Sequence, residues 1–221
     1  MPLNEKQIAQ LRESIQHYDF PCVYYDFVEN RKITAPNMHG LEAAIGCMLR
    51  APDINGVKDG LANVLYWGYA QTGYGLTRVN RFRREVTNDH LTHFQNLLAG
   101  NRVPNLIQVG GLGIPEFSGV SFVSKVLMFL NPNDYCVLDL KLAGLRTSAN
   151  HRALSRLVVN KTHIRITENN QAVYDDWREE CRSISDHYFA GQYRVVDVER
   201  GFFGLIGRRQ LQLAQTIYAA A

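Results

Sequence analysis

The sequence predicts a mostly α-helical protein with little β-sheet. Apolar residues recur at intervals of three and four along most of the chain, which is the period of an amphipathic helix. Asn or Thr stands before several of these segments, where its side chain caps a helix. Neither an internal repeat nor a low-complexity linker interrupts the 221 residues, a length that suits one domain or two small lobes with a real core. We expect a single domain over residues 1–221 and a monomer.

The N-terminal half predicts four long helices separated by polar or glycine-rich segments. Asn4, Asn37 and Thr87 are placed to cap three of them, and Asn55 starts the other. The aromatic stretch 23–28 fits either a helix or a strand. A loop with three glycines precedes the basic segment, and glycine permits tight turns and close approach to a ligand. The four helices are expected at residues 4–18, 37–50, 55–67 and 87–99.

The C-terminal half is organised around residues 114–146. A turn at 117–121 leads into an apolar helix at 121–130, which Pro132 stops. A short apolar run then brings Asp139 to the start of another helix. Further helices are expected at residues 104–111, 149–158, 168–189, 194–205 and 209–220, with a short strand at 163–166.

Composition excludes several classes of function. The net charge is only +3, so contact with nucleic acid needs local basic patches and not a global field. The sequence contains no apolar run of about 18 residues and no signal-peptide core. The four cysteines include no Cys-x-x-Cys pair, which argues against a zinc ribbon, an iron–sulfur cluster and a disulfide framework. We therefore expect reduced thiols in a cytoplasmic protein.

Two ionisable residues stand out against apolar surroundings in the central stretch. Lys125 lies inside the helix 121–130, and Asp139 opens the next helix. A carboxylate at a helix start is either an N-cap or a functional group held where the helix dipole favours negative charge. A buried lysine is either a nucleophile that has lost its proton or a side chain that extends to the surface or contacts a DNA phosphate. The residue types alone leave both alternatives open.

A basic cluster follows the glycine-rich loop. Arg78, Arg81 and Arg84 recur at intervals of three residues. Such a stripe either contacts DNA phosphates without reading sequence or forms a solvated helix face. His90 and His93 are also three residues apart, but no third ligand stands near them in the sequence, so we expect no metal site there.

The central stretch resembles the helix-hairpin-helix DNA glycosylase superfamily, which includes the 8-oxoguanine DNA glycosylases. In that superfamily a Gly-x-Gly-x-Lys hairpin leads into a helix, and an aspartate follows at the start of the next helix. This chain has Gly119-Val120-Ser121, then Lys125, then Leu138-Asp139. It also resembles a bacterial branch of proteins with an 8-oxoguanine-glycosylase-like fold, in the segments 65–68, 78–82, 122–139 and 196–203.

The hairpin departs from the superfamily pattern at two positions. Ser121 replaces the second glycine, and Lys125 falls two positions after the usual lysine, where Val123 stands. The interval between Lys125 and Asp139 is also short. Asp139 is therefore the better-placed match.

The resemblance implies a two-lobed helical fold and a DNA glycosylase. Such an enzyme flips a damaged or modified nucleotide out of double-stranded DNA, into a pocket between the lobes, and cleaves the N-glycosidic bond, with or without AP-lyase activity. Asp139 would stabilise the positive charge that develops on the sugar, and Lys125 would be the nucleophile or a pocket residue. Gly119, Ser121 and the three arginines would contact DNA. The chemistry requires no metal and no other cofactor.

The base pocket is expected to use aromatic residues and the charged residues of segment 196–203. Each aromatic residue either stacks on an extruded base or packs in the core. The charged residues form either a buried salt bridge or an edge that recognises the base. The expected pocket residues are Tyr66, Trp67, Asp197, Arg200 and Phe203, with Tyr69 and Tyr74 as further stacking candidates.

Several questions stay open at the level of sequence. The target is either oxidised guanine or a hypermodified base of phage DNA, so the role is either DNA repair or anti-phage defence. A non-catalytic helix-hairpin-helix module that binds DNA phosphates is the alternative function. A regulatory domain without a nucleic-acid partner is a further alternative, which DNA affinity that is absent or independent of salt would favour.

Overall fold

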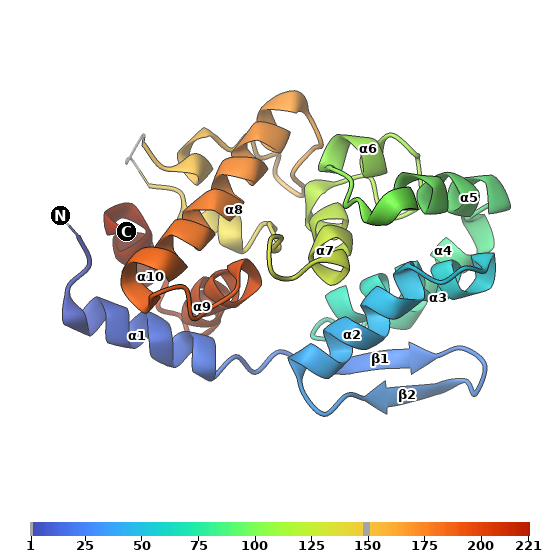
Figure 1. Cartoon of the computed structure of the whole chain (residues 1–221), viewed down its shortest axis with the longest axis horizontal. Helices are drawn as coiled ribbons and strands as arrows, with labels where there is room; N and C mark the ends of the chain where they lie inside the picture. Colours follow the sequence, from blue (N-terminus) through green and yellow to red (C-terminus); the bar gives the residue numbers. More distant parts are fainter. Residues whose placement is uncertain (1, 148–150) are drawn as a thin grey trace. The chain divides into compact units, whose positions relative to one another are not determined.

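The computed structural model describes residues 2–147 and 151–221, and these are mostly helical (Figure 1). They form ten α-helices, three short 3₁₀ helices (η1–η3) and one two-stranded sheet, so the predicted mostly α-helical class is confirmed. The chain divides into two compact units. Unit 1 comprises Met1–Asp19 and Pro132–Ala221, and unit 2 comprises Phe20–Asn131.

Unit 2 begins with a β-hairpin. β1 (Val23–Asp26) pairs antiparallel with β2 (Arg31–Thr34), so the ambiguous aromatic stretch contains a strand. The side-chain oxygen of Asn63 accepts a hydrogen bond from the Tyr25 N–H at 2.6 Å, and its amide donates to the Tyr25 carbonyl at 3.0 Å. Because the buried Asn63 side chain bonds both the N–H and the carbonyl of Tyr25, it fixes β1 against the helix that carries Asn63.

Six α-helices complete unit 2, and polar side chains define where most of them begin. Asn37, Asp53, Thr87 and Asn105 each accept a hydrogen bond from a backbone N–H of the first turn. Asp53 is the cap of the helix that was expected to start at Asn55. The helices are α2 (Met38–Leu49), α3 (Ile54–Gly68), α4 (Gly75–Glu85), α5 (Asn88–Leu97), α6 (Leu106–Gly110) and α7 (Val120–Leu130), with η1 (Ala99–Asn101) after α5.

The central helix of unit 2 is α7. It packs against α2, α3 and α6, and most of its 11 residues are buried. A helix that is covered on nearly every side is apolar all round, which explains the uninterrupted run from Val126 to Leu130. The short helix α6 precedes α7, and the turn between them ends at Gly119.

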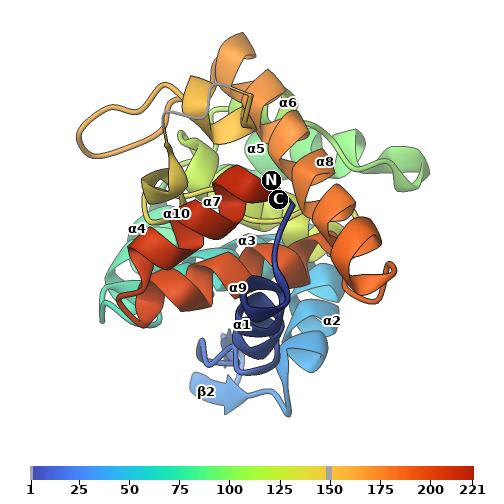
Figure 2. The same cartoon turned by 90° about the vertical axis from the view of Figure 1, so that its left-hand side faces the viewer.

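The central helix of unit 1 is α9, which packs against α1, α8, α10 and η2 (Figures 1 and 2). The predicted buried stripe of α8 is confirmed, because Val173, Trp177, Cys181 and Ile184 are all buried. The elements of unit 1 are α1 (Glu5–Gln16), η2 (Leu142–Leu145), η3 (Ala153–Arg156), α8 (Glu168–Phe189), α9 (Val195–Gly207) and α10 (Leu211–Ala220).

Two glycines allow α1 to approach α9 closely. A Cβ on Gly201 would lie 2.7 Å from Ile15 Cγ1, and a Cβ on Gly204 would lie 2.7 Å from Ser14 Oγ. The Ser14 hydroxyl donates to the Gly201 carbonyl at 2.6 Å. A larger residue at either glycine would force the two helices apart. This contact keeps Tyr18, just after α1, beside α9.

The helix expected at 149–158 is much shorter in the structure. Only Ala153–Arg156 is helical, and residues 149–150 lie outside the described residues. The Ala153 N–H donates to Glu180 Oε1 at 2.9 Å, and the next N–H donates to the Tyr218 hydroxyl at 3.1 Å. These tertiary hydrogen bonds take the N–H groups that a longer helix would use.

Two further expectations for unit 1 are corrected. The helix expected after Asp139 is the four-residue 3₁₀ helix η2, and it ends where Arg146 takes an extended backbone conformation with ψ of 131°. Gly144 lies inside it, and glycine is a poor helix former. Residues 163–166 belong to neither strand of the sheet.

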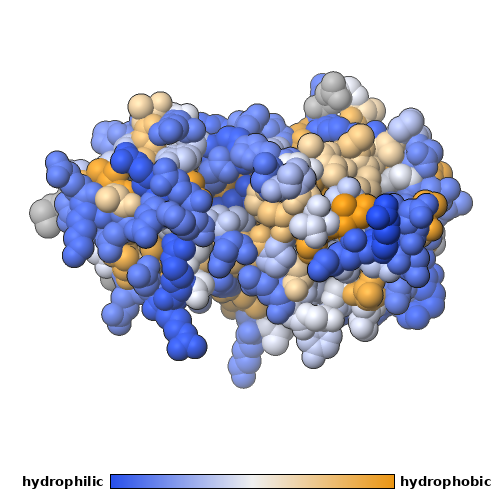
Figure 3. Space-filling model, turned by 90° about the horizontal axis from the view of Figure 1, so that it is seen from below, coloured by the Kyte–Doolittle hydropathy of each residue, from blue (hydrophilic) through white to orange (hydrophobic). Residues whose placement is uncertain are grey.

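Both chain ends lie in unit 1 (Figure 2). The Tyr188 hydroxyl oxygen lies 3.4 Å from the Leu3 nitrogen and 3.4 Å from the Ala221 carbonyl oxygen. Polar side chains cover most of the face drawn in Figure 3, and apolar ones form smaller patches. None of the described helices has the combined length and apolar character that a membrane span requires. The exposed large apolar side chains of the described residues are Val28, Tyr74, Leu76, Leu140, Val158 and Leu211.

Candidate functional site

Asp139 follows a segment of unit 1 without regular secondary structure, whose backbone is bonded by buried side chains. The Trp177 indole N–H donates to the Val137 carbonyl at 3.2 Å, and the Tyr174 hydroxyl donates to the carbonyl one residue earlier at 2.7 Å. The Val137 N–H donates to Glu199 Oε2 at 3.4 Å. Because α8 supplies two of these partners and α9 supplies the third, the core of unit 1 fixes the segment that presents Asp139.

The Asp139 side chain caps the turn that follows it. Its Oδ1 atom accepts hydrogen bonds from the backbone N–H groups of Lys141 and Leu142, both at 3.0 Å. Asp139 therefore caps this turn, while the N-cap residue of the short helix η2 that follows is Lys141. Asp139 is also partly exposed, and the two hydrogen bonds give the carboxylate a fixed orientation, which a capping role and a catalytic role both allow.

Aromatic and charged side chains gather around the Asp139 turn within unit 1. The Phe203 ring lies edge-on to Tyr18, with 6.1 Å between the ring centroids. The Lys141 ammonium nitrogen lies 3.5 Å from the centroid of the Phe203 ring, and the Arg200 guanidinium carbon lies 5.3 Å from the centroid of the Tyr18 ring. We call this group the Asp139 cluster; its members are Tyr18, Asp139, Lys141, Glu199, Arg200 and Phe203.

Burial and charge shift the pKa of two members of the Asp139 cluster. Burial raises the pKa of the Tyr18 phenol, which Arg200 opposes and the two carboxylates of the cluster reinforce. Burial lowers the pKa of the Lys141 ammonium, against the attraction of the same two carboxylates and of Asp19. Tyr18 and Lys141 both contact the Phe203 ring, and the Lys141 ammonium loses its proton more readily than in water.

Asp197, a predicted pocket residue, belongs to an ion-pair group. It accepts two hydrogen bonds from the Arg194 side chain at 2.8 Å, and Arg200 Nη1 lies 3.5 Å from its Oδ1. Burial alone would raise the pKa of Asp197, but the hydrogen bonds from Arg194 and the charges of both arginines lower it. The salt-bridge alternative is therefore the one observed for Asp197, and Arg200, which is buried, links this ion pair to the Asp139 cluster.

Lys125, the other predicted catalytic residue, lies in α7 of unit 2. Only 7% of it is exposed. Its ammonium donates to the Ser121 carbonyl of the preceding turn at 3.0 Å and lies 5.2 Å from the centroid of the Phe122 ring. Its aliphatic chain passes the end of α3, where a Cβ on Gly68 would lie 3.3 Å from Lys125 Cδ. Lys125 and Asp139 thus belong to different units, and the contacts of Lys125 described above lie within unit 2.

The predicted hairpin residues Gly119 and Ser121 lie at the N-terminus of α7. Gly119 is the N-cap and has no side chain with which to bond the first turn. Ser121 lies inside the first turn of α7 and not in the preceding turn, because the helix begins at Val120. Backbone N–H groups at a helix start are a suitable partner for phosphate, so DNA contact at both residues stays a prediction.

The predicted phosphate-binding arginines of α4 have different surroundings. Arg78 and Arg81 both contact the Glu116 carboxylate, at 3.0 and 3.4 Å. Glu116 precedes α7 in the chain and has a φ of 72°, a left-handed conformation that is rare for a residue with a side chain. Arg84 lies 3.5 Å from Glu85 and has 73% of its side chain exposed. Two of the three arginines therefore brace the turn, and Arg84 is the most exposed of them.

The aromatic candidates of unit 2 divide into core and surface residues. Trp67 is 3% exposed, and its indole N–H donates to a backbone carbonyl at 3.1 Å, so it packs in the core. Tyr66 and Tyr69 are partly exposed, and burial raises the pKa of both phenols. Tyr74 is 63% exposed. Of the four, Tyr74 has the most surface available for a nucleic-acid base.

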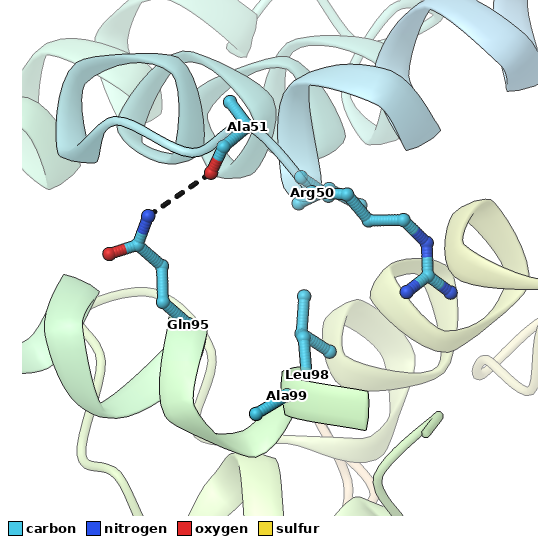
Figure 4. Close-up of a pocket in the computed structure, with 6 residues that line it drawn as sticks. Arg50, Ala51, Gln95, Leu98 and Ala99 are labelled. Carbon is cyan, nitrogen blue, oxygen red and sulfur yellow. Dashed lines mark hydrogen bonds between the residues drawn. The ribbon is translucent and has the colours of Figure 1, made fainter. Parts of the chain in front are cut away.

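A cavity of about 250 Å³ in unit 2 contains none of the predicted site residues. The Gln95 amide donates to the Ala51 carbonyl beside it at 3.1 Å (Figure 4). Among residues 2–147 and 151–221, no three His, Cys, Asp or Glu side chains are grouped to hold a metal ion. His90 instead accepts the Thr87 N–H in the cap of α5. The cavity is lined by Leu49, Arg50, Ala51, Gln95, Leu98 and Ala99.

Comparison with protein-family models, with curated proteins and with solved structures gave no match. The resemblance to helix-hairpin-helix DNA glycosylases therefore stays a prediction from the sequence.

Three residues of interest were missed in the sequence: Tyr18, Glu116 and Lys141. Lys141 carries one local signal, its place two residues after Asp139, where an aspartate accepts bonds from the following N–H groups. Its position on Phe203 depends on tertiary packing that no local pattern shows. The same holds for Tyr18 and Glu116, whose partners are distant in sequence.

Proposed function

We propose that this protein is a DNA glycosylase that extrudes a damaged or modified base from double-stranded DNA and cleaves its N-glycosidic bond. The Asp139 cluster is the observation that carries the proposal. It combines a partly exposed carboxylate of fixed orientation with an amine and a phenol whose pKa values are shifted. Such a combination suits a reaction that develops positive charge on a sugar.

Asp139 would act as an ionised carboxylate in the proposed reaction. As the bond between C1′ and the base nitrogen breaks, positive charge develops on the deoxyribose, and the carboxylate stabilises it. A water molecule bonds to C1′ and gives up a proton, while the base leaves with the bonding electrons and takes up a proton. The hydrogen bonds from Lys141 and Leu142 hold the carboxylate before the reaction begins, so little reorganisation is needed.

DNA would be held by exposed charge and by an exposed aromatic ring of unit 2. Arg84 offers a guanidinium for a phosphate, and the first turn of α7 offers backbone N–H groups. Tyr74, at the end of the glycine-rich loop, offers a ring on which a base stacks. Phe203 and Tyr18 are the aromatic residues of the Asp139 cluster, and we assign them to the base pocket together with Arg200.

The second candidate is a non-catalytic helix-hairpin-helix module that binds DNA phosphates. The contact of Lys125 favours it, because this predicted nucleophile donates to a carbonyl of its own helix in unit 2. This module would bind duplex DNA with a strong dependence on salt and would leave every base in place.

A panel of duplexes tests the proposed function. Each duplex carries one modified base, such as oxidised guanine, uracil, an alkylated purine or a bulky modified pyrimidine, and an unmodified duplex is the control. Free base and strand nicks are scored separately. The proposal expects release of at least one modified base by the wild-type protein. Salt-dependent binding without release from any duplex would favour the binding module, and absence of binding would favour a regulatory domain.

A further inference from the structure

We propose that Lys141, and not Lys125, is the amine that attacks the sugar of the abasic site after the base has left. This inference rests on the proposed function and adds a catalytic residue to it. It is carried by the position of Lys141 in the same turn as Asp139 and by the location of its ammonium group on the Phe203 ring.

The geometry joins Lys141 to the Asp139 carboxylate and to α9. The backbone N–H of Lys141 donates to Asp139 Oδ1 at 3.0 Å, so both side chains leave one turn of unit 1. The Lys141 ammonium lies 3.5 Å from the Phe203 centroid. A Cβ on Gly207 would lie 3.1 Å from the same nitrogen, so glycine at the end of α9 leaves the space that the amine occupies.

The surroundings of the Lys141 amine suit a nucleophile. Within the described part of the chain the nitrogen makes no hydrogen bond or ion pair, and it lies 3.5 Å from the centroid of the Phe203 ring. Burial lowers the pKa of the ammonium, while Asp139 of the same turn, Asp19 after α1 and Glu199 of α9 favour its charge. The carboxylates and the ring keep the side chain at the site, and partial burial increases the share of the neutral amine that can attack carbon.

Lys125 of unit 2 has a hydrogen bond within its own helix. Its ammonium donates to the Ser121 carbonyl of its own helix at 3.0 Å, and only 7% of the residue is exposed in the centre of α7. A lysine packed in this way stabilises the first turns of its helix. Its presence in the sequence beside the hairpin therefore has a structural explanation.

The proposed reaction of Lys141 conserves atoms and charge. The Lys141 ammonium first gives up a proton to water, and the nitrogen lone pair then bonds to C1′ of the open-chain abasic aldehyde. The carbonyl oxygen takes up one proton from this nitrogen and one from water, and it leaves as water to give a protonated imine. Asp139 accepts a proton from C2′, and the C3′–O bond breaks with the 3′ phosphate as the leaving group. Added borohydride transfers hydride to the imine carbon, which converts the adduct into a stable secondary amine.

Borohydride trapping on a duplex with a preformed abasic site tests the inference. The proteins compared are the wild type, Lys141→Arg, Lys141→Gln and Lys125→Gln, with Lys6→Gln of α1 as the matched control because Lys6 is an exposed lysine of the same unit. We expect a covalent adduct with the wild type, Lys125→Gln and Lys6→Gln, and none with the two Lys141 variants. Peptide mapping of the wild-type adduct should find the sugar on Lys141, a result that needs no variant to fold.

Several results would overturn the inference. These are a wild-type adduct on Lys125, an adduct that persists in both Lys141 variants, or no adduct with the wild type. The abasic duplex does not require base release. The experiment therefore tests the assignment of Lys141 independently of the proposed glycosylase function. An adduct on Lys141 without base release from any duplex would overturn only the glycosylase proposal. Base release without an adduct on Lys141 would overturn only the assignment of this amine.

Discussion

The two groups of charged residues, one in each unit, are satisfied in different ways. In unit 2, Arg78 and Arg81 share the Glu116 carboxylate, and Lys125 bonds to its own helix. In unit 1, the Lys141 ammonium lies on the Phe203 ring, and burial lowers the pKa of this ammonium. Charges that pair with each other hold a fold together, whereas a partly buried charge without an ion pair is available for chemistry.

Residues of one chemical type also differ in burial and in contacts within unit 2. Trp67 and Tyr74 are both aromatic and both lie near the glycine-rich loop, but one is 3% exposed and the other is 63% exposed. Arg83 and Arg84 are neighbours in α4. Arg83 pairs with Asp59 and lies 4.3 Å from the Phe27 centroid. Each pair offers an internal control for the distinction between packing and function.

The largest effect on stability is expected at Trp67. Trp67→Ala should destabilise the protein by about 3–5 kcal/mol, because a large core side chain is removed. Tyr74→Ala should change stability by less than about 0.5 kcal/mol and should weaken DNA binding by about 1–3 kcal/mol through lost stacking. Denaturant unfolding and a DNA titration measure the two quantities. A Trp67→Ala protein of wild-type stability would show that this residue is not part of the core.

The next largest effect is expected for Arg83 and Arg84, the two adjacent arginines of α4. Arg84→Ala should reduce the salt slope of DNA binding by about 0.9, the value for one lost phosphate contact, with little change in stability. Arg83→Ala should leave the slope unchanged and should lower the unfolding free energy by about 1 kcal/mol, because an ion pair and a cation–π contact are lost. Equal slopes for the wild type and Arg84→Ala would place this face of α4 away from DNA.

The smallest effect is a pH dependence of stability at Lys141. Because burial lowers the pKa of its ammonium in the folded protein, the unfolded chain binds more protons between the folded pKa and the ordinary value of about 10.4. Stability from this group therefore rises with pH through that window and is lowest below it. Lys141→Met should remove the rise, so the stability difference between variant and wild type should change in favour of the wild type as pH increases. Parallel stability curves over this range would contradict the shift.

Much of the fold follows from local sequence, and the exceptions have physical causes. The helix at 168–189 matches α8 residue for residue because its cap, apolar stripe and length all agree. The β-hairpin was ambiguous because residues 23–28 are aromatic and apolar without a clear period. Its turn places Asn30 at a φ of 50° and has no glycine to mark it.

The candidate site was less visible in the sequence than the fold. Asp139 was found because a helix start has a local signature, and the same signature explains its capping contact. Lys125 stood out as a charge in an apolar helix, yet its carbonyl partner is local and structural. Lys141 and Tyr18 acquire their importance only when α1, η2 and α9 pack together, which depends on close approach at Gly201.

Base release by Asp139→Asn tests the central claim most directly. Asparagine keeps the oxygen that accepts the two backbone N–H groups, so the cap is retained and only the negative charge is lost. Asp53→Asn, the same exchange at the cap of α3, is the matched control. On the duplex from which the wild type releases a base, we expect Asp139→Asn to be slower by at least about 10²-fold, with nearly unchanged binding, and Asp53→Asn to retain the wild-type rate. Release by Asp139→Asn at the wild-type rate would contradict the assignment of the chemistry to the Asp139 cluster.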